Sequence, residues 1–394
     1  MARTPLLRAA DVLVSFVDGL DEIDPAAWDA LGDPDDPFTT WAFLAALERS
    51  GSATAETGWR PMHLVAERDG VLVAAAPLYL KSHSYGEYIF DWGWADGARR
   101  AGLKYYPKLL CAVPFTPATG RRLLGDPALS GLLVDAMRHL AEAAGLSSVH
   151  VLFHSAAEQG LWTAPWMARA SYQLHWEAAG ERSFEEHLAK FRHKERKEAR
   201  RERRRPDEVG ATVSVLRGAE IDAGAWAALD GFYRSTVDRK WGEAYLTPRF
   251  FAEAGARLGE LPVAVMAAVN GDWVAGALCY QRGRHLYGRH WGCTPGYERL
   301  HFELCYHRPI ALCIESGWTR FEAGAQGEHK LKRGLLPRPT YSAHWIAHPG
   351  LRRAVAAFLA EEAVGVEAQM EALTAHGPHR DEPNTESREC GSIA

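Results

Sequence analysis

The sequence repeats itself at the level of whole structural elements, and this repeat limits the possible fold more than any other feature. Gly70 to Ala76 (GVLVAAA) resembles Gly271 to Ala277 (GDWVAGA), and Tyr79 then falls opposite Tyr280. In both places a turn that contains glycine separates two β-prone runs, which predicts a hairpin. We therefore expect two copies of one α/β unit within the chain.

The elements expected around these hairpins have the same order in both halves: a strand, two helices, three antiparallel strands, a helix and a further strand. Thr116-Pro117 and Thr294-Pro295 each follow a strand, and each precedes a helix that ends in glycine. The 394 residues suffice for two domains. We expect a mixed α/β fold with a first domain at residues 11–180, a basic helical arm at 181–206, a second domain at 207–348, a C-terminal helix at 349–375 and a disordered tail at 376–394.

The segment between the two halves is strongly basic. From Lys190 to Arg205 there are ten lysine or arginine residues against three glutamates, and neither glycine nor proline interrupts Phe184 to Arg205. This pattern predicts one long helix, most of which is too polar to bury. It is either a solvated charged arm or a docking surface for RNA or for a phosphate-bearing substrate.

Two β-like runs flank a polar, glycine-rich loop between Phe321 and Ile346. Such a loop is either a solvated turn or a place where a site is built. Gln326, Glu328, His329, Lys330 and Arg333 lie within it, and Gly327 would let the backbone approach a ligand. Glutamate and histidine can move protons, and lysine and arginine can hold an anionic group.

Tyr85 to Lys108 contains seven tyrosine, phenylalanine or tryptophan residues among four glycines. These aromatic residues are either part of a core or the lining of a pocket.

Composition excludes several classes of protein. Hydrophobic residues make up 47% of the chain and charged residues 24%, which are ordinary values for a soluble globular protein. A net charge of −5 gives no reason to expect the whole surface to bind nucleic acid. No run of 18 apolar residues occurs and no signal sequence opens the chain, so we expect a cytoplasmic protein without a membrane span. The six cysteines show no CxxC pairing, the HExxH motif is absent and the histidines are scattered, so we expect reduced thiols and no metal site.

Several segments resemble a known family. They are PLYLKSHSYGEYIFDWGWA, YYPKLLCAVPFTPATGRRLL, FRHKERKEARRERR, HWGC, FEAGAQGEHKLKRG and SAHWI. They are similar to bacterial FemAB-like proteins of peptidoglycan biosynthesis or recognition, relatives of the Fem-type peptidyltransferases, in which the GNAT acyltransferase unit is duplicated. The resemblance covers about Trp41 to Ile346, nearly the whole folded chain.

The resemblance implies a transferase that moves an acyl or aminoacyl group onto an amine, in peptidoglycan-precursor or small-molecule amine metabolism. The donor would be acyl-coenzyme A, as in ordinary GNAT enzymes, or aminoacyl-tRNA, as in Fem-type relatives, with Lys190 to Arg205 as a tRNA contact. Neither Thr116 to Arg121 nor Thr294 to Gly296 matches the usual GNAT pyrophosphate signature cleanly. The alternative is a non-catalytic protein that recognises a wall precursor or RNA.

Direct attack of the amine is favoured, because no Gly-x-Ser-x-Gly elbow and no recognisable cysteine nucleophile occurs. The candidate catalytic residues are Glu328 and His329 as bases, and Gln326 and Tyr85 as donors to the oxyanion. The candidate substrate- or cofactor-binding residues are Lys81, Lys108, Thr116, Gly120, Arg121, Trp291, Gly327, Lys330, Arg333 and His344.

Overall fold

The computed structural model describes residues 5–239, 242–325 and 327–379, and within them the predicted repeat of elements is present. The helices and strands of the first half are β1 (Leu7–Ala9), β2 (Val12–Val17), α1 (Pro25–Asp29), α2 (Trp41–Arg49), β3 (Trp59–Pro61), β4 (His63–Arg68), β5 (Val71–Ala76), β6 (Leu78–Lys81), α3 (Trp92–Arg100), β7 (Lys108–Cys111), β8 (Leu124–Gly125), α4 (Ser130–Ala143), β9 (Ser148–His154) and β10 (Met167–Glu177).

Three helices, α5 (Phe184–Ala189), α6 (His193–Arg203) and α7 (Arg205–Glu208), follow the first half. The second half then consists of β11 (Thr212–Arg217), α8 (Ala223–Arg239), α9 (Pro248–Arg257), β12 (Pro262–Val269), β13 (Asp272–Arg282), β14 (His285–Cys293), α10 (Arg308–Ser316), β15 (Arg320–Glu322), β16 (Leu336–Ile346) and α11 (Pro349–Ala375). A one-turn π-helix at Glu303–His307 precedes α10, and a 3-10 helix at Glu328–Arg333 precedes β16.

Local sequence signals explain many of these boundaries. Asp24 caps α1, since its Oδ2 accepts a hydrogen bond from the Ala27 backbone N–H at 2.8 Å and Pro25 takes the first helical position. The two predicted hairpins, β4–β5 and β12–β13, are both present. Their turns need left-handed backbone, which Asp69-Gly70 supplies with φ of 50° and 79° and Asn270-Gly271 with φ of 53° and 92°.

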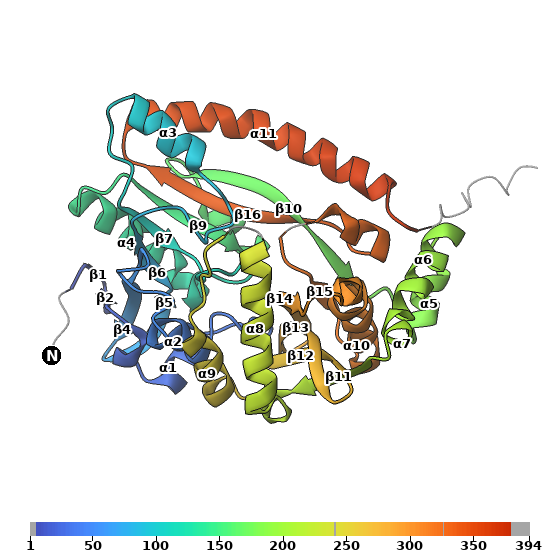
Figure 1. The fold of residues 1–394 in the computed structure, drawn as a ribbon. Coiled ribbons are helices and arrows are strands. Elements are labelled where there is room, and N and C mark those ends of the chain that lie inside the picture. Colours follow the sequence, from blue (N-terminus) through green and yellow to red (C-terminus); the bar gives the residue numbers. More distant parts are fainter. Residues whose placement is uncertain (1–4, 240–241, 326, 380–394) are drawn as a thin grey trace, which may run out of the picture.

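The strands form a five-stranded sheet with the order β1-β2-β4-β5-β8 and an eleven-stranded sheet with the order β11-β12-β13-β14-β15-β10-β16-β9-β7-β6-β3. In the larger sheet the last strand of each half has crossed into the other half. β10 pairs with β15, β16 pairs with β9, and the two pair with each other from Met167–His344 to His175–Leu336. The proposed domain boundaries stay a prediction, but the halves share one continuous sheet (Figure 1).

The halves also share a hydrophobic core, which lies between α1 and α2 of the first half and α8 and α9 of the second. Phe43 of α2 packs edge-on against Phe250 of α9, with ring centres 6.1 Å apart. Phe38 packs in the same manner against Tyr280 of β13, at 5.6 Å. This seam between the halves, lined by polar groups beside the core, is where the cavities described below lie.

The prediction of one long helix from Phe184 to Arg205 is wrong, because the basic segment forms the three short helices α5, α6 and α7. Phe191, at the break between α5 and α6, is 1% exposed and packs against the rings of His187 and His379. The Arg192 backbone N–H donates to the Pro378 carbonyl oxygen. In a continuous helix this N–H would bond within the helix instead, so the helix ends where Phe191 turns into the core. His376 to His379 therefore pack onto the basic segment, and residues 380–394 of the expected tail lie outside the described residues.

Helix α11 lies along β10 and β16 at one face of the large sheet (Figure 1). Arg169 of β10 and Glu362 of α11 form an ion pair at 2.7 Å across this contact. None of the helices in the described residues is long and apolar enough to cross a membrane. The described cysteines, Cys111, Cys279, Cys293, Cys305 and Cys313, form no disulfide with one another, and all but Cys305 are buried.

Candidate functional site

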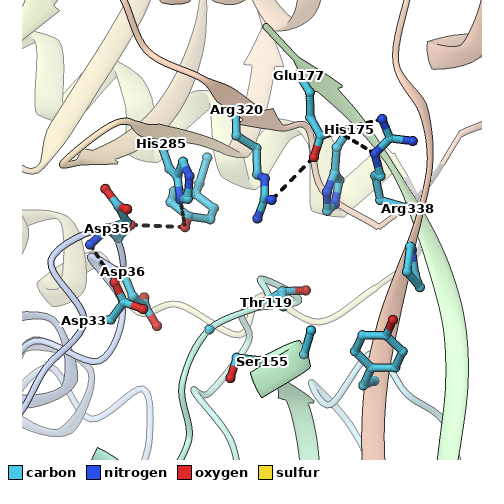
Figure 2. Close-up of a pocket in the computed structure, with 15 residues that line it drawn as sticks. Asp33, Asp35, Asp36, Thr119, Ser155, His175, Glu177, His285, Arg320 and Arg338 are labelled. Atoms are coloured by element: carbon cyan, nitrogen blue, oxygen red, sulfur yellow. Dashed lines mark hydrogen bonds and ion pairs between the residues drawn. The ribbon is translucent and has the colours of Figure 1, made fainter. Parts of the chain in front are cut away.

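A polar cavity of about 340 Å³ lies at the seam between the two halves (Figure 2). Asp33 to Asp36 and the loop around Gly120 enclose it from the first half, and the beginnings of β14, β15 and β16 and the end of β10 form its opposite wall. Its labelled lining residues in Figure 2 are Asp33, Asp35, Asp36, Thr119, Ser155, His175, Glu177, His285, Arg320 and Arg338.

Strand alternation places the charged groups of this cavity on one face of the sheet. In the pairing of β10 with β15, His175 lies opposite Glu322 and Glu177 lies opposite Arg320. Phe321, between them in sequence, points to the other face and is fully buried in the core. A period of two along each strand therefore brings two carboxylates, an imidazole and a guanidinium together.

Glu177 holds two arginines at the cavity wall. Its carboxylate accepts a hydrogen bond from Arg338 Nε at 2.8 Å and one from Arg320 at 3.4 Å. Partial burial works to raise the pKa of Glu177, but the hydrogen bonds and charges of the two arginines outweigh it and hold the pKa below its usual value. Glu177 is therefore ionised near neutral pH, and it fixes two donors at the edge of the cavity.

Glu322 lies directly behind this wall. It is 2% exposed, and its Oε2 accepts a hydrogen bond from the Thr119 backbone N–H at 3.4 Å and lies 3.8 Å from His175 Nε2. Its Oε1 has no hydrogen-bond partner among the described residues and is 3.9 Å from an Arg320 nitrogen. Burial raises the pKa of Glu322 from 4.5 to about 7, against the opposing charge of Arg320. A carboxyl group with this pKa can both take up and release a proton near neutral pH.

His175 does not supply a charge here. Burial, together with the positive charge of Arg320, lowers the pKa of His175 to about 3, so its imidazole is neutral. The carboxyl group of Glu177 in the wall and that of Glu322 behind it therefore differ in protonation, with Glu177 ionised and Glu322 near the midpoint of its titration near neutral pH. Such a separation is typical of acid–base sites.

The loop after β7 brings the first half against Glu322. Arg122 is 1% exposed, and it donates to the Leu152 and Ala118 carbonyl oxygens and lies 3.7 Å from the Asp36 carboxylate. Gly120 passes so close to Asp36 that an added Cβ would lie 2.1 Å from Asp36 Oδ2. The loop is therefore fixed on both sides, and Thr119 reaches Glu322 from a rigid support.

The polar loop of the second half is only partly described. Gln326 lies outside the described residues, as does the side chain of Glu328. His329 is exposed and hydrogen-bonds Tyr306 Oη at 2.9 Å, and Gly327, with φ of 102°, lies where a Cβ would be 2.3 Å from the His329 ring. The roles predicted for these residues stay predictions.

Lys330 and Arg333, expected to bind an anion, both point into the protein. Lys330 is 2% exposed and donates to the Gly324 carbonyl oxygen at 2.5 Å, and burial lowers its pKa to about 7. Arg333 is 5% exposed and makes two hydrogen bonds to the Glu202 carboxylate, at 2.5 and 3.1 Å. The Arg333–Glu202 ion pair ties the polar loop to helix α6.

In the first half, Lys81 and Lys108 lie opposite each other on β6 and β7 and are fully buried. Lys108 donates to Glu87 at 2.8 Å and to Asp91 at 2.5 Å, inside a closed cluster. His344 is buried nearby and pairs with His150 Nδ1 at 2.7 Å. Tyr85 and Trp291 line cavities other than the one in Figure 2, so the structure does not bring the predicted site residues together.

Thr116, Gly120 and Arg121 lie in the loop that would bind a pyrophosphate if the first half followed the GNAT pattern. The backbone N–H groups of Arg122 and Leu123 donate instead to Glu158 Oε1, at 3.0 and 2.8 Å. The Gly120 N–H donates to a carbonyl oxygen, and the Arg121 side chain donates to two carbonyl oxygens within the loop. A carboxylate of the chain itself thus occupies two backbone amides directly after Arg121 that could otherwise bind an anionic ligand.

Sequence reasoning missed Glu322 and the Glu177 clamp, although Glu322 lies in the stretch singled out. The available signal was a charged residue in a short β-run, directly before a glycine-rich loop. No group of three or more histidine, cysteine, aspartate or glutamate side chains within residues 5–239, 242–325 and 327–379 could hold a metal ion.

The model of the FemAB-like family, described as peptidoglycan biosynthesis/recognition, matches residues 19–381. No curated protein matches the sequence. Solved structures that resemble the chain include the C-terminal domain of a putative lysylphosphatidylglycerol synthetase from Agrobacterium fabrum (TM-score 0.54, 12% identity, 87% of this chain and 97% of that chain covered) and FemX (TM-score 0.53, 12% identity, 85% and 98% covered). A conserved protein from Bacteroides thetaiotaomicron has a TM-score of 0.51 at 11% identity, with 84% and 99% covered. At these identities the likeness concerns the fold.

Proposed function

The chain belongs to the FemAB-like family, and on this premise we propose that it transfers an acyl or aminoacyl group to an amine at the seam between its halves. The observation that carries the proposal is Glu322, a buried carboxyl group whose pKa is raised to about 7, directly behind the wall of a cavity that is lined by Arg320 and Arg338. An amine becomes a nucleophile only when it loses a proton, and a carboxylate with a pKa near neutrality suits that task.

In the proposed reaction the nitrogen of the amine attacks the carbonyl carbon of the donor. A C–N bond forms, and the C–O bond of an aminoacyl ester or the C–S bond of a thioester breaks. Glu322 accepts the proton that the nitrogen loses and returns it to the departing oxygen or sulfur. Arg320 and Arg338, held by Glu177, are positioned to bind an anionic part of one substrate.

We favour aminoacyl-tRNA over acyl-coenzyme A as the donor. In the first half Glu158 accepts hydrogen bonds from two loop amides that would otherwise be free for a pyrophosphate, and in the second half the Gly296 N–H donates to Glu298 at 3.1 Å. In contrast, Lys194, Lys197, Arg201 and Arg204 of the basic segment are exposed. Their spacing of three, four and three residues puts them on one face of α6 and its end, and this basic stripe suits a phosphate backbone.

The chemical step is tested by turnover. Purified protein is incubated with a pool of tRNA charged with radiolabelled amino acids and with a mixture of primary amines, and acceptor-dependent loss of label from tRNA is followed. Glu322→Gln should lower the rate by about 10² to 10⁴, the range expected for loss of a positioned acid–base group. Glu315→Gln, an exposed glutamate on α10, is the matched control and should leave the rate unchanged. Equal rates for the Glu322 and Glu315 variants would refute the proposed role of Glu322.

The donor is tested by binding. Substituting all four residues of the basic stripe with serine should weaken tRNA binding. The slope of the logarithm of the binding constant against the logarithm of the salt concentration should become less steep by about three to four, since each phosphate contact contributes about 0.9. Arg99→Ser/Arg100→Ser is the control, because α3 lies far from α6 (Figure 1). If the serine variant of the stripe binds tRNA with unchanged salt dependence, tRNA is not the donor. Acyl-coenzyme A would then be tested as the donor in the turnover assay.

The rival function is binding without chemistry, in which the stripe recognises RNA and the cavity holds a wall precursor. The basic stripe favours it as much as it favours a tRNA donor. The two functions separate by turnover, because a binding protein retains affinity for tRNA, releases no label from charged tRNA with any amine and does not turn over acyl-coenzyme A.

A further inference from the structure

A second and larger cavity, of about 750 Å³, lies at the same seam but has a different lining. Four aromatic residues line it. Trp59, Tyr85 and Phe115 come from the first half, and Tyr245 comes from the second. Phe115 and Tyr245 stack with ring centres 5.1 Å apart and an interplanar angle of 6°, and Trp59 meets Phe115 edge-on at 5.1 Å. The two halves therefore build this aromatic cage together.

The charged side chains among the described residues that line the cage are acidic. Glu56 and Glu243 line it and are exposed, and no arginine or lysine is among the described residues that line it. Burial and the nearby charge of Lys81 lower the pKa of His83, which also lines the cage, so its imidazole is neutral near pH 7. Negative charge at the opening and electron-rich ring faces together attract a cation and do not suit a phosphate.

Lys81 lies behind this lining. Its Nζ is 3.8 Å from the centre of the Trp59 ring and donates to the Tyr85 carbonyl oxygen at 3.2 Å. Burial lowers the pKa of Lys81 to about 7, so much of it is uncharged near neutral pH and repels a cation in the cage less than an ordinary lysine would.

Phe115 is held in a conformation that a bulky residue avoids. Its φ is 57°, and an added Cβ on Gly86 would lie 2.6 Å from the Phe115 ring. Arg289 of β14 donates a hydrogen bond to the Phe115 carbonyl oxygen. Left-handed backbone at a bulky residue is strained and persists where the surroundings fix it, which is a common property of ligand sites.

The aromatic surface continues outside the cavity. Tyr85 is 59% exposed and its ring centre lies 5.9 Å from that of Trp92, which stacks on Phe90 at 4.4 Å. Trp92 and Phe90 are 49% and 42% exposed. A ligand whose cation entered the cage would find an apolar surface for the rest of its body along this strip.

We propose that the aromatic cage binds an organic ammonium, a cationic group of the acceptor substrate other than the amine that Glu322 deprotonates. The identification with the acceptor rests on the proposed transfer, whereas binding of the ammonium does not. The cage and the cavity of Figure 2 lie at one seam, and the loop after β7 contributes to both, with Phe115 in the cage and Thr119, which donates to Glu322, in the first cavity. The first cavity serves the donor and the cage recognises the acceptor.

The test compares two probes of equal length, N-acetylcadaverine, which carries one ammonium, and N-hexylacetamide, in which a methyl group replaces the ammonium. Binding to the full chain is measured by titration calorimetry at pH 7.5 without donor. The ammonium probe should bind at least tenfold more tightly than the neutral probe. Glu56→Gln/Glu243→Gln should weaken the ammonium probe at least tenfold, and Tyr85→Leu should weaken it further. Glu361→Gln/Glu371→Gln, two exposed glutamates on α11, is the matched control and should bind as the wild type does.

Equal affinity for the two probes, or unchanged affinity in the Glu56/Glu243 variant, would overturn the cage. These results are separable from failure of the proposed function, because binding is measured without donor. Ammonium binding with no transfer to any amine would leave the cage standing and refute the transferase. Transfer that is insensitive to the Glu56/Glu243 substitutions would place the acceptor elsewhere.

Discussion

Ionisation of Glu322 should make the stability of this protein fall as the pH rises, and Glu322→Gln should remove that contribution. The pKa of Glu322 is raised from 4.5 in the unfolded chain to about 7 in the folded chain, chiefly by burial. Between these two values the folded state holds a proton that the unfolded state has released, so the free energy of unfolding decreases with increasing pH. The stabilisation is complete below the lower pKa and is lost once the pH has passed the higher one.

The size of the effect follows from the two pKa values. They differ by about 2.5, and at about 1.4 kcal/mol for each unit the loss between pH 4.5 and pH 8 is about 3 kcal/mol. Glutamine cannot ionise, and its side-chain oxygen can still accept the hydrogen bond from Thr119. The free energy of unfolding of Glu322→Gln, relative to wild type, should therefore be about 3 kcal/mol higher at pH 8 than at pH 4.5.

The assay is urea denaturation followed by tryptophan fluorescence between pH 4.5 and pH 8, since the chain has 14 tryptophans. Other titrating groups act alike in both proteins and cancel in the difference. Glu177→Gln is the internal control and has the opposite sign, because the pKa of Glu177 is held below its ordinary value and its stabilisation is present at high pH. A difference between Glu322→Gln and wild type that does not change with pH would refute the raised pKa, and with it the proton-transfer role.

Two further predictions concern the first half. Lys108→Met leaves the buried carboxylates of Glu87 and Asp91 without their cation and should cost about 3–5 kcal/mol of the free energy of unfolding at pH 7; a loss below 1 kcal/mol in urea denaturation would contradict the ion pairs. Gly120→Ala puts a methyl group 2.1 Å from Asp36 Oδ2 and should cost about 1–3 kcal/mol, measured in the same way, with Gly131→Ala, which meets nothing within 4 Å, as the control; equal stability of the two variants would show that Asp36 moves freely.

The sequence predicted elements well where the signal was local. Asp24-Pro25 set the beginning of α1, and glycine turns set both hairpins, because caps and left-handed turns depend on a few adjacent residues. The prediction of one continuous basic helix was wrong because its break depends on a contact that is distant in sequence. Phe191 is one apolar residue among charges, and only its contact with His379, distant in sequence, reveals that the helix must break there.

The candidate site was predictable only in part. Strand alternation could have shown that Glu322 points to the face of the sheet away from the core-facing Phe321. Its partners His175 and Thr119, however, come from the first half, and no sequence period gives that pairing. Lys330 and Arg333 matched the chemistry of an anion site, yet both point inward, toward Gly324 and Glu202. Residue type gives the possible chemistry, while direction depends on the packing of the whole chain.

The crossed strands have a consequence for the origin of the chain. If β10 and β16 came from two separate copies of one α/β unit, each copy would lend its last strand to the other, and the antiparallel pairing of β10 with β16 would lie on the axis between them. That arrangement is a strand-swapped homodimer. The present chain has the form of such a dimer fused by α5 to α7, and neither half, expressed alone, would possess a complete sheet.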